Sequence, residues 1–220
     1  MGNTMGVVFG KIVVETTKYE VVRKAFEYEI RRYAPSVIAQ VTYAPSEFKG
    51  DKDSGFGVLV DYIGFLRTPK NTKPEKIAMT TPVVTAASGE KVAMTTPVVT
   101  KAGAGEKIAM TTPVITDEKN DLVTMQFVLP DKYKKAAEAP TPTDPRVVIL
   151  EEGEKDYGVV TFSGAATDSV VAEKARKLRG WLERDGVKVV GDYSLARYNP
   201  PWITLPAFRT NEVKYPVELN

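Results

Sequence analysis

The chain has 220 residues, of which 43% are hydrophobic and 26% are charged, a composition typical of one globular domain or of two fused halves. Thirty Lys and Arg residues against 28 Asp and Glu residues leave a net charge of +2, and the absence of a basic stripe argues against binding to nucleic acid. The sequence contains no histidine and no cysteine, which excludes a Ser-His or Cys-His catalytic pair, a zinc site of the ordinary type and a disulfide.

The sequence has the features expected of a soluble protein. The start, Met1 to Phe9, has neither the basic residues nor the long apolar stretch of a secretory signal, and no apolar run approaches a membrane span in length. The lack of cysteine fits a reducing compartment. We therefore expect a cytoplasmic protein.

The first part of the chain predicts strand, strand, helix, strand, strand. Residues Tyr28–Arg32 and Val37–Tyr43 alternate between apolar and polar, which predicts a hairpin around Ala34-Pro35. Residues Ser46–Phe65 predict a helix whose apolar stripe falls at helical spacing: Phe56, Leu59, Val60 and Ile63. Strands are expected next within residues 75–116 and at Leu122–Leu129.

Residues 75–116 contain three near-identical segments: Glu75–Thr85, Glu90–Thr100 and Glu106–Thr116. Each is rich in Thr and Val, which favours a strand, and each carries one proline, which predicts an edge strand, a bulge or a split. Because the copies have almost the same side-chain pattern, they compete for one place in a sheet. We expect one or two copies to lie outside the main sheet, although an extended meander of all three is the alternative.

The second part of the chain repeats the same plan after a linker rich in Ala and Pro at Ala136–Pro145. Strands are predicted at Val147–Glu151 and Tyr157–Ser163, as a hairpin across Gly153, and a helix at Ser169–Asp185. Asp168 or Ser169 is expected to cap this helix and Gly186 to end it, with an apolar stripe of Val171, Ala175, Leu178 and Leu182. The last strands are predicted at Tyr193–Tyr198 and Glu212–Leu219.

The order of these elements predicts the fold class. We expect one α+β domain over residues 1–220, with a distorted antiparallel β-barrel or curved sheet and two main helices. It would be built from two ββαββ-like halves, about residues 19–135 and 146–220, with a cleft where the halves meet.

Several short segments in a fixed order give the chain a family resemblance. The segments are YEIRRYAP at Tyr28–Pro35, GFGVLVDYIG at Gly55–Gly64, NTKPEKIAMTTPV at Asn71–Val83, MQFVLP at Met125–Pro130, FSG at Phe162–Gly164 and ARYNPPW…RTNEV at Ala196–Val213. Together they closely resemble the SOUL haem-binding protein family, above all its plant-type cytosolic members, over about residues 9–219.

The resemblance implies a small carrier or buffer that binds haem or a related tetrapyrrole. It places the ligand against the first helix and the loop before the last strand. The implied binding residues are Phe56, Leu59, Val60, Ile63, Tyr198, Pro201, Trp202, Ile203 and Arg209. From the residues alone, the simpler interpretation is structural in each case: the helix stripe is core, the Tyr198–Trp202 segment a stiff corner, and Arg209, Asn211 and Glu212 a structural network.

The chain departs from the family in one respect, because it offers no histidine as an axial ligand for iron. Methionine alone is a weak ligand for ferric iron, so Met79, Met94, Met110 and Met125 are expected to fill the core. Tyr62 and Tyr198 are weak candidates for phenolate ligation. We therefore expect hydrophobic binding of the tetrapyrrole without a His or Cys ligand, and no other cofactor.

Two further functions stay open on the sequence. The repeat, with its Thr-rich segments broken by proline, is suited to accept a strand from a protein partner. Relatives of the fold include hydrolases, but the only acidic cluster, Glu151, Glu152 and Glu154, falls at a predicted turn. A non-enzymatic binding protein is therefore the expected class.

Overall fold

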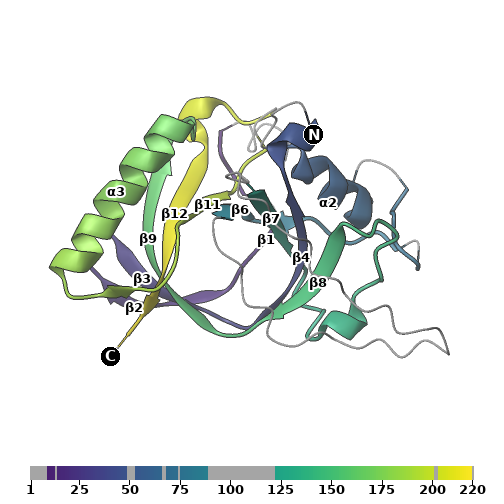
Figure 1. The fold of residues 1–220 in the computed structure, drawn as a ribbon, viewed down its shortest axis with the longest axis horizontal. Coiled ribbons are helices and arrows are strands. Elements are labelled where there is room, and N and C mark those ends of the chain that lie inside the picture. Colours follow the sequence, from purple (N-terminus) through teal and green to yellow (C-terminus); the bar gives the residue numbers. More distant parts are fainter. Residues whose placement is uncertain are drawn as a thin grey trace, which may run out of the picture.

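The structure, a computed structural model, describes residues 9–12, 14–48, 53–65, 68–73, 75–88, 122–200 and 203–219. A curled antiparallel sheet forms a half-barrel, and the helices α2 (Gly55–Ile63) and α3 (Asp168–Arg184) pack on opposite sides of it (Figure 1). The predicted α+β class, with a curved antiparallel sheet and two main helices, is confirmed.

The main sheet has ten strands, and a short parallel pair lies beside it. Short 3-10 helices occupy Pro45–Phe48, Ala136–Glu138 and Pro206–Phe208. β10 (Lys188–Val189) pairs with β12, and the parallel pair is β1 (Glu15–Thr16) with β5 (Thr80–Thr81). The path through the sheet runs β2 (Tyr19–Lys24), β3 (Glu29–Tyr33), β9 (Lys155–Ser163), β12 (Thr210–Glu218), β11 (Ser194–Arg197), β6 (Val83–Ser88), β7 (Leu122–Val128), β4 (Ser36–Tyr43) and β8 (Val147–Glu152).

The two predicted hairpins are wrong in their pairing, although their strands are present. β3 does not pair with β4, nor β8 with β9; instead β3 pairs with β9 and β4 with β8. The register continues across the bend, because Tyr33 lies opposite Lys155 and Ser36 lies opposite Glu152. Each predicted hairpin is therefore one long bent strand, and the two bent strands pair with each other from Glu29 opposite Val159 to Val41 opposite Val147.

The two halves of the chain have the same element order. β3, β4, α2, β6 and β7 are matched by β8, β9, α3, β11 and β12. Equivalent strands meet where the halves join, since β6 pairs with β11. This arrangement is the one expected of a duplicated unit, and the duplication itself stays an interpretation.

The first copy of the repeat enters the sheet. It is split at Pro82 into β5 and β6, as proline predicts, but β6 is an interior strand between β11 and β7 rather than an edge. The split explains how an interior position is possible, because Pro82 itself lies outside both strands. The second and third copies lie outside the described residues.

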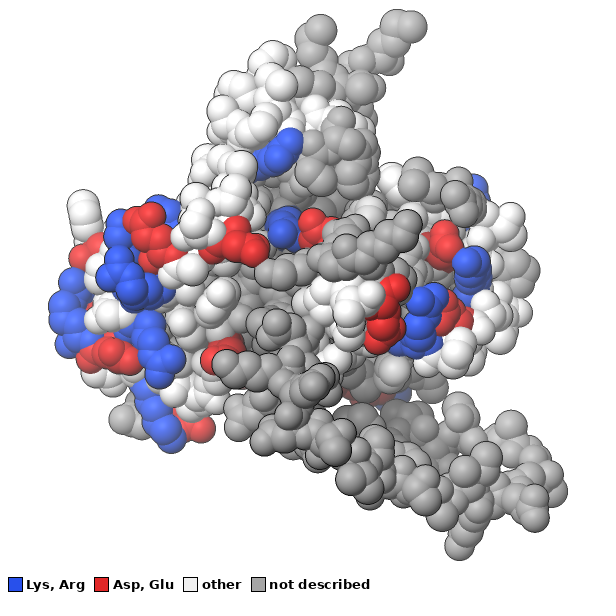
Figure 2. Space-filling model, turned by 45° about the horizontal axis from the view of Figure 1, so that its top comes forward, with Lys and Arg blue, Asp and Glu red and all other residues white. Residues whose placement is uncertain are grey.

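Each helix covers a separate apolar core. Val171, Ala175, Leu178 and Leu182 of α3 are all buried against one end of the sheet, as predicted. The outer face of α3 carries ion pairs such as Glu173–Lys177 and Arg179–Glu183, and Figure 2 shows charged side chains crowded on that side of the molecule. α2 is buried on most of its surface and packs on β4 and β7, with Met125 and Phe127 beneath it.

The ends of the helices differ from the prediction. α2 is much shorter than Ser46–Phe65, since residues 45–48 form a 3-10 turn and α2 begins at Gly55. Thr167, rather than Asp168 or Ser169, caps α3 by accepting a hydrogen bond from the Val170 backbone N–H. Gly186 follows α3 with φ +71°, as expected of a helix end. Strand β2, whose side chains are all exposed, was not predicted.

No helix in the described ranges is long and apolar enough to cross a membrane.

The close approach of α3 to the sheet leads to a test of stability. A Cβ on Gly158 of β9 would lie 2.7 Å from a Leu182 Cδ atom, and Leu182 is fully buried. Gly158→Ala should therefore lower the free energy of unfolding by about 1–3 kcal/mol in chemical denaturation. Gly153→Ala is the matched control, because nothing lies within 4 Å of its Cβ position. Equal stability of the two variants would contradict the tight packing of α3.

Candidate functional site

The helix residues implied as ligand contacts lie mainly in the core. Leu59 and Ile63 are 0% and 1% exposed and face the strands beneath α2. Phe56 is partly exposed, and its ring lies 5.5 Å from that of Phe127. Val60 is buried and lines a hollow on the outer side of the helix. Packing accounts for Leu59 and Ile63, and contact of the stripe with a ligand stays a prediction.

The loop residues implied as ligand contacts are spread over different environments. Tyr198 is buried, Ile203 is exposed, and Pro201 and Trp202 lie outside the described residues. The Arg209 Nε atom donates to the carbonyl oxygen of Thr204, which ties the loop to itself. Of the implied loop residues that the structure describes, Ile203 is the apolar one exposed to solvent.

The structure brings the loop before β12 close to the start of α2. Arg197, at the end of β11, forms an ion pair with Asp53 at 2.9 Å, just before α2 begins. Asn199 donates to the Gly10 carbonyl oxygen and accepts from the Thr210 backbone N–H, which fixes both ends of the loop. The two segments implied by the family resemblance are therefore neighbours.

An exposed apolar surface is formed by this loop together with Phe9 from the N-terminal segment. We call it the apolar loop surface, and its residues are Phe9, Ile203, Leu205 and Phe208. Phe9 and Phe208 contact each other edge to face, with ring centroids 5.4 Å apart. The sequence analysis did not single out Phe9, Leu205 or Phe208, although three apolar residues within Ile203–Phe208, a segment with little charge, were a usable signal.

A hollow of about 320 Å3 lies on the outer side of α2. Val60 and Asp61 line it from the helix, and Asp144 and Arg146 line it from the segment before β8. Asp61 pairs with Lys70 at 2.7 Å and Asp144 with Arg146 at 2.6 Å, so two cations lie near it.

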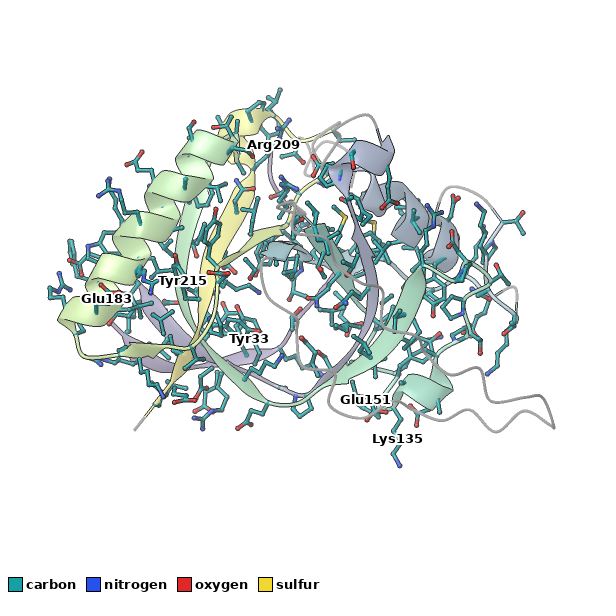
Figure 3. All side chains as sticks on the ribbon, in the orientation of Figure 1. Tyr33, Lys135, Glu151, Glu183, Arg209 and Tyr215 are labelled. Carbon is teal, nitrogen blue, oxygen red and sulfur yellow. The ribbon has the colours of Figure 1, made fainter. Side chains whose placement is uncertain are left out.

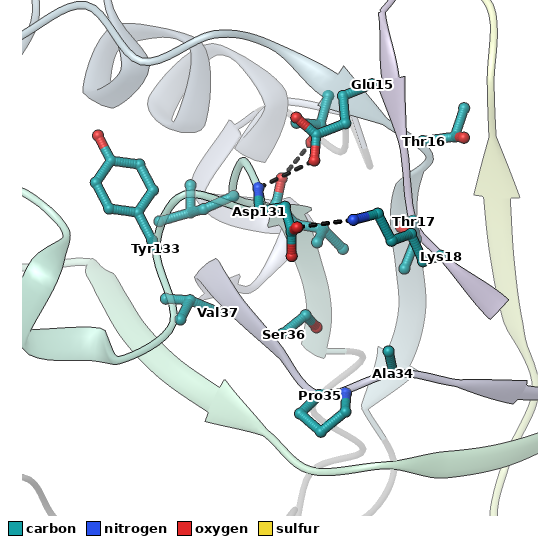
Figure 4. Close-up of a pocket in the computed structure, with 13 residues that line it drawn as sticks. Glu15, Thr16, Thr17, Lys18, Ala34, Pro35, Ser36, Val37, Asp131 and Tyr133 are labelled. Atoms are coloured by element: carbon teal, nitrogen blue, oxygen red, sulfur yellow. Dashed lines mark hydrogen bonds and ion pairs between the residues drawn. The ribbon is translucent and has the colours of Figure 1, made fainter.

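A smaller cavity near the end of β7 can hold only water. Its volume is about 40 Å3, and Glu15, Lys18, Asp131 and Tyr133 are among its lining residues (Figure 4). Lys18 pairs with Asp131 at 2.7 Å across it. Drug-sized ligands need about 300 Å3 or more, so this cavity is excluded as a tetrapyrrole site.

The two tyrosines considered as iron ligands are both engaged elsewhere. The Tyr62 hydroxyl donates to the Pro140 carbonyl oxygen at 2.8 Å, and the Tyr198 hydroxyl donates to Glu212 at 2.6 Å. Burial raises the pKa of both phenols, and the Glu212 carboxylate raises that of Tyr198 further. A phenolate is therefore disfavoured at both positions. Within the described ranges, no group of three or more acidic side chains is placed to hold a metal ion.

The concave face of the sheet carries a buried polar cluster that the sequence analysis missed. Because side chains alternate along a strand, Val213 and Tyr215 of β12 face α3, whereas Glu212 and Lys214 face the inside of the curl. Tyr33 of β3 lies on the same inner side, and Tyr215 lies towards α3 (Figure 3). The alternation was readable in the sequence, but the burial of the charged face was not.

Arg31 and Glu212 form the centre of this cluster. The Arg31 Nη1 atom lies 2.7 Å from Glu212 Oε1, and both side chains are at most 7% exposed. Arg31 also contacts Glu29 at 2.8 Å and the Tyr19 ring at 4.3 Å. Burial is the largest single effect and lowers the pKa of Arg31, but the Glu212 carboxylate and Tyr33 together raise it by more, so the net direction is upward. The predicted network of Arg209 with Glu212 is corrected, because Arg31 is the partner.

This ion pair leads to a second test of stability. Glu212→Gln would leave Arg31 buried with Glu29 as its remaining acidic partner, so we expect a loss of about 3 kcal/mol in the free energy of unfolding. Glu218→Gln, on the same strand, removes the exposed pair with Lys188 and should leave stability almost unchanged. A small effect at Glu212 in urea denaturation would show that the buried pair is not stabilising.

Solved structures resemble the fold at low sequence identity. The EcmrR C-terminal domain is 14% identical, with a TM-score of 0.51, and the likeness covers 92% of this chain and 99% of that one. EcmrR in a DNA complex is 13% identical, with a TM-score of 0.53, over 88% of this chain and 58% of that one. An uncharacterised conserved protein from Listeria innocua is 11% identical, with a TM-score of 0.50, over 87% and 92%. These likenesses concern the fold alone, and the chain spans little more than half of the second structure.

No curated protein matches the sequence. The family model described as SOUL heme-binding protein matches residues 14–91 and 100–216. The unmatched residues between them, 92–99, fall inside the second copy of the repeat. The match includes β3, α2, α3, β12 and the loop before β12, and it covers most of the chain. The chain therefore belongs to the SOUL haem-binding protein family.

Proposed function

We propose that the protein binds haem or a related tetrapyrrole reversibly, as a carrier or buffer, and that the apolar loop surface beside the start of α2 contributes to the site. Family membership supports the ligand class. The observation that carries the location is the exposure of Phe9, Ile203, Leu205 and Phe208 in one region, next to the loop that Arg197 ties to Asp53. Exposed apolar groups gathered in one place are typical of a binding surface.

Hydrophobic contact alone is strong enough for a carrier. Burying a few hundred Å2 of porphyrin surface at about 25 cal/mol per Å2 contributes several kcal/mol. After the costs of association, this corresponds to a dissociation constant on the order of 10^-6 M. An affinity in this range allows both uptake and release of the ligand.

The iron is not expected to receive an imidazole or thiolate from this chain, because the sequence has no His and no Cys. Tyr62 and Tyr198 are protonated and hydrogen-bonded. When bound, haem would supply the chemistry of its own iron, and the chain would supply apolar contact and cations for the propionates. Lys70 and Arg146, near the hollow on α2, and Arg209 are candidates for that contact.

Two alternatives remain proposals of lower rank. The repeat is suited to bind a protein partner, and its first copy already fills the sheet position between β11 and β7, so the other copies are not needed there. A hydrolase would need an acid-base pair with shifted pKa values in a cleft, and nothing in the hollow on α2 suggests one. The main proposal, a tetrapyrrole carrier or buffer, includes a non-enzymatic role in the cytoplasm.

The location of the site is tested by a pair of phenylalanine variants. Phe208→Asp places a charge on the apolar loop surface and should weaken hemin binding about tenfold, because it removes apolar contact. Phe26→Asp is the control, since Phe26 is fully exposed at the turn between β2 and β3. Binding is measured by quenching of tryptophan and tyrosine fluorescence during hemin titration. Unchanged affinity in Phe208→Asp would place the site elsewhere.

The absence of an iron ligand is tested with a metal-free porphyrin. Protoporphyrin IX should bind with a dissociation constant within about tenfold of that for hemin, because both present the same apolar face. Equilibrium dialysis of the two compounds against the full chain gives both constants. Binding of hemin a hundredfold more tightly would show that a side chain coordinates the iron, and failure of both to bind would overturn the proposed function.

A further inference from the structure

Lys214 is a buried cation without an ion-pair partner in the part of the chain that the structure describes. It lies on β12 and is only 6% exposed. Its ammonium group lies 4.7 Å from the centre of the Tyr33 ring and 5.5 Å from that of the Tyr157 ring. These residues come from three neighbouring strands, β3, β9 and β12, so the ammonium group lies on the concave face above two aromatic rings.

The Tyr33 hydroxyl is a second unused donor in the same cluster. Tyr33 is 6% exposed, and its buried hydroxyl makes no well-aligned hydrogen bond among the described residues. The nearby Arg31 guanidinium can only donate, so the Tyr33 O–H has no acceptor there. Buried polar groups are nearly always hydrogen-bonded, so one that is not suggests that a partner is missing. Tyr33 and Lys214 therefore present two unused donors beside each other.

The nearby carboxylates are already occupied. Glu212 accepts from Arg31 and Thr161 through Oε1 and from Tyr198 through Oε2. Glu29 accepts from Arg31, and Glu152 pairs with Lys155 at 3.1 Å. None of the three forms an ion pair with Lys214 among the described residues, and burial lowers the pKa of Lys214 to about 8. The charged form of Lys214 is thus only partly compensated by the protein.

We propose that this concave face binds a small monocarboxylate whose oxygens accept hydrogen bonds from the Lys214 ammonium group and the Tyr33 hydroxyl. The rings of Tyr33 and Tyr157 would contact its organic part, which favours a planar or aromatic acid. One free cation matches one negative charge, whereas a phosphate dianion would be repelled by Glu212 and Glu29. This site is separate from the apolar loop surface and does not depend on tetrapyrrole binding.

The affinity should depend on the protonation of Lys214. The carboxylate pairs with the charged amine, so it binds fully at pH values below about 8 and more weakly as the pH rises above it. Three other charged groups act on Lys214: Glu212 on β12, Arg31 on β3 and Glu152 on β8. The titratable groups in contact with it are Tyr33 on β3 and Tyr157 on β9. Burial raises the pKa of Tyr33 and Tyr157, so both stay neutral over this range.

The experiment uses benzoate and acetate with the full chain in isothermal titration calorimetry, without haem. Benzoate should bind at millimolar concentration or below, and Lys214→Met and Tyr33→Phe should each weaken it about tenfold or more. Lys174→Met is the matched control, because Lys174 also lies over an aromatic ring, that of Phe162, but on the outer helix α3. The control should bind benzoate as the unmodified protein does.

Several results would overturn the proposal. The first is that neither acid binds. The second is that benzamide or inorganic phosphate binds as tightly as benzoate. The third is that Tyr33→Phe binds benzoate as tightly as the unmodified protein does. If Lys214→Met does not fold, the pH profile of the unmodified protein decides, since constant affinity between pH 6 and about 9.5 excludes Lys214 as the partner. Because hemin is absent, failure here leaves the tetrapyrrole proposal untouched.

Discussion

The pairing of two long bent strands, β3–β4 with β8–β9, is the constraint on which the rest of the structure depends. The register is the same on both sides of the bend, from Tyr33 opposite Lys155 to Ser36 opposite Glu152. Because the two strands bend together, the sheet curls and has a convex and a concave face. The helices cover the convex face at its two ends, and the loop before β12 reaches the start of α2.

The curl gives the two faces of each strand different chemistry. On the convex side, Leu59 and Leu178 fill two apolar cores. On the concave side, Arg31 and Glu212 are buried as a pair, and Tyr33 and Lys214 keep unused donors. Buried charges need partners, so the charged groups of the inner face either pair with one another or bind a ligand. The proposed tetrapyrrole site lies instead on the exposed apolar residues at the loop.

Fold class and element types could be predicted from the sequence because they depend on local patterns. The α3 stripe with Leu178 and Leu182 was correct, as was the end of that helix at Gly186. The hairpins were wrong because Pro35 and Gly153 indicate a change of direction but not its partner. Leu59 and Ile63 were named as site residues because of the family resemblance. Helical spacing identifies an apolar face of the helix, but it does not show that neighbouring strands bury that face.

The sequence by itself determined the absence of imidazole and thiolate, the two helices with their apolar stripes, an irregularity at Pro82 and the family. These follow from residue types and from spacing along a few turns or one strand. Only the tertiary structure decided that β3 pairs with β9, that Glu212 meets Arg31 across 181 residues, and that Lys214 is buried beside Tyr33. Each of these contacts joins segments that are far apart in the chain. Local sequence preferences do not specify which distant segments come into contact.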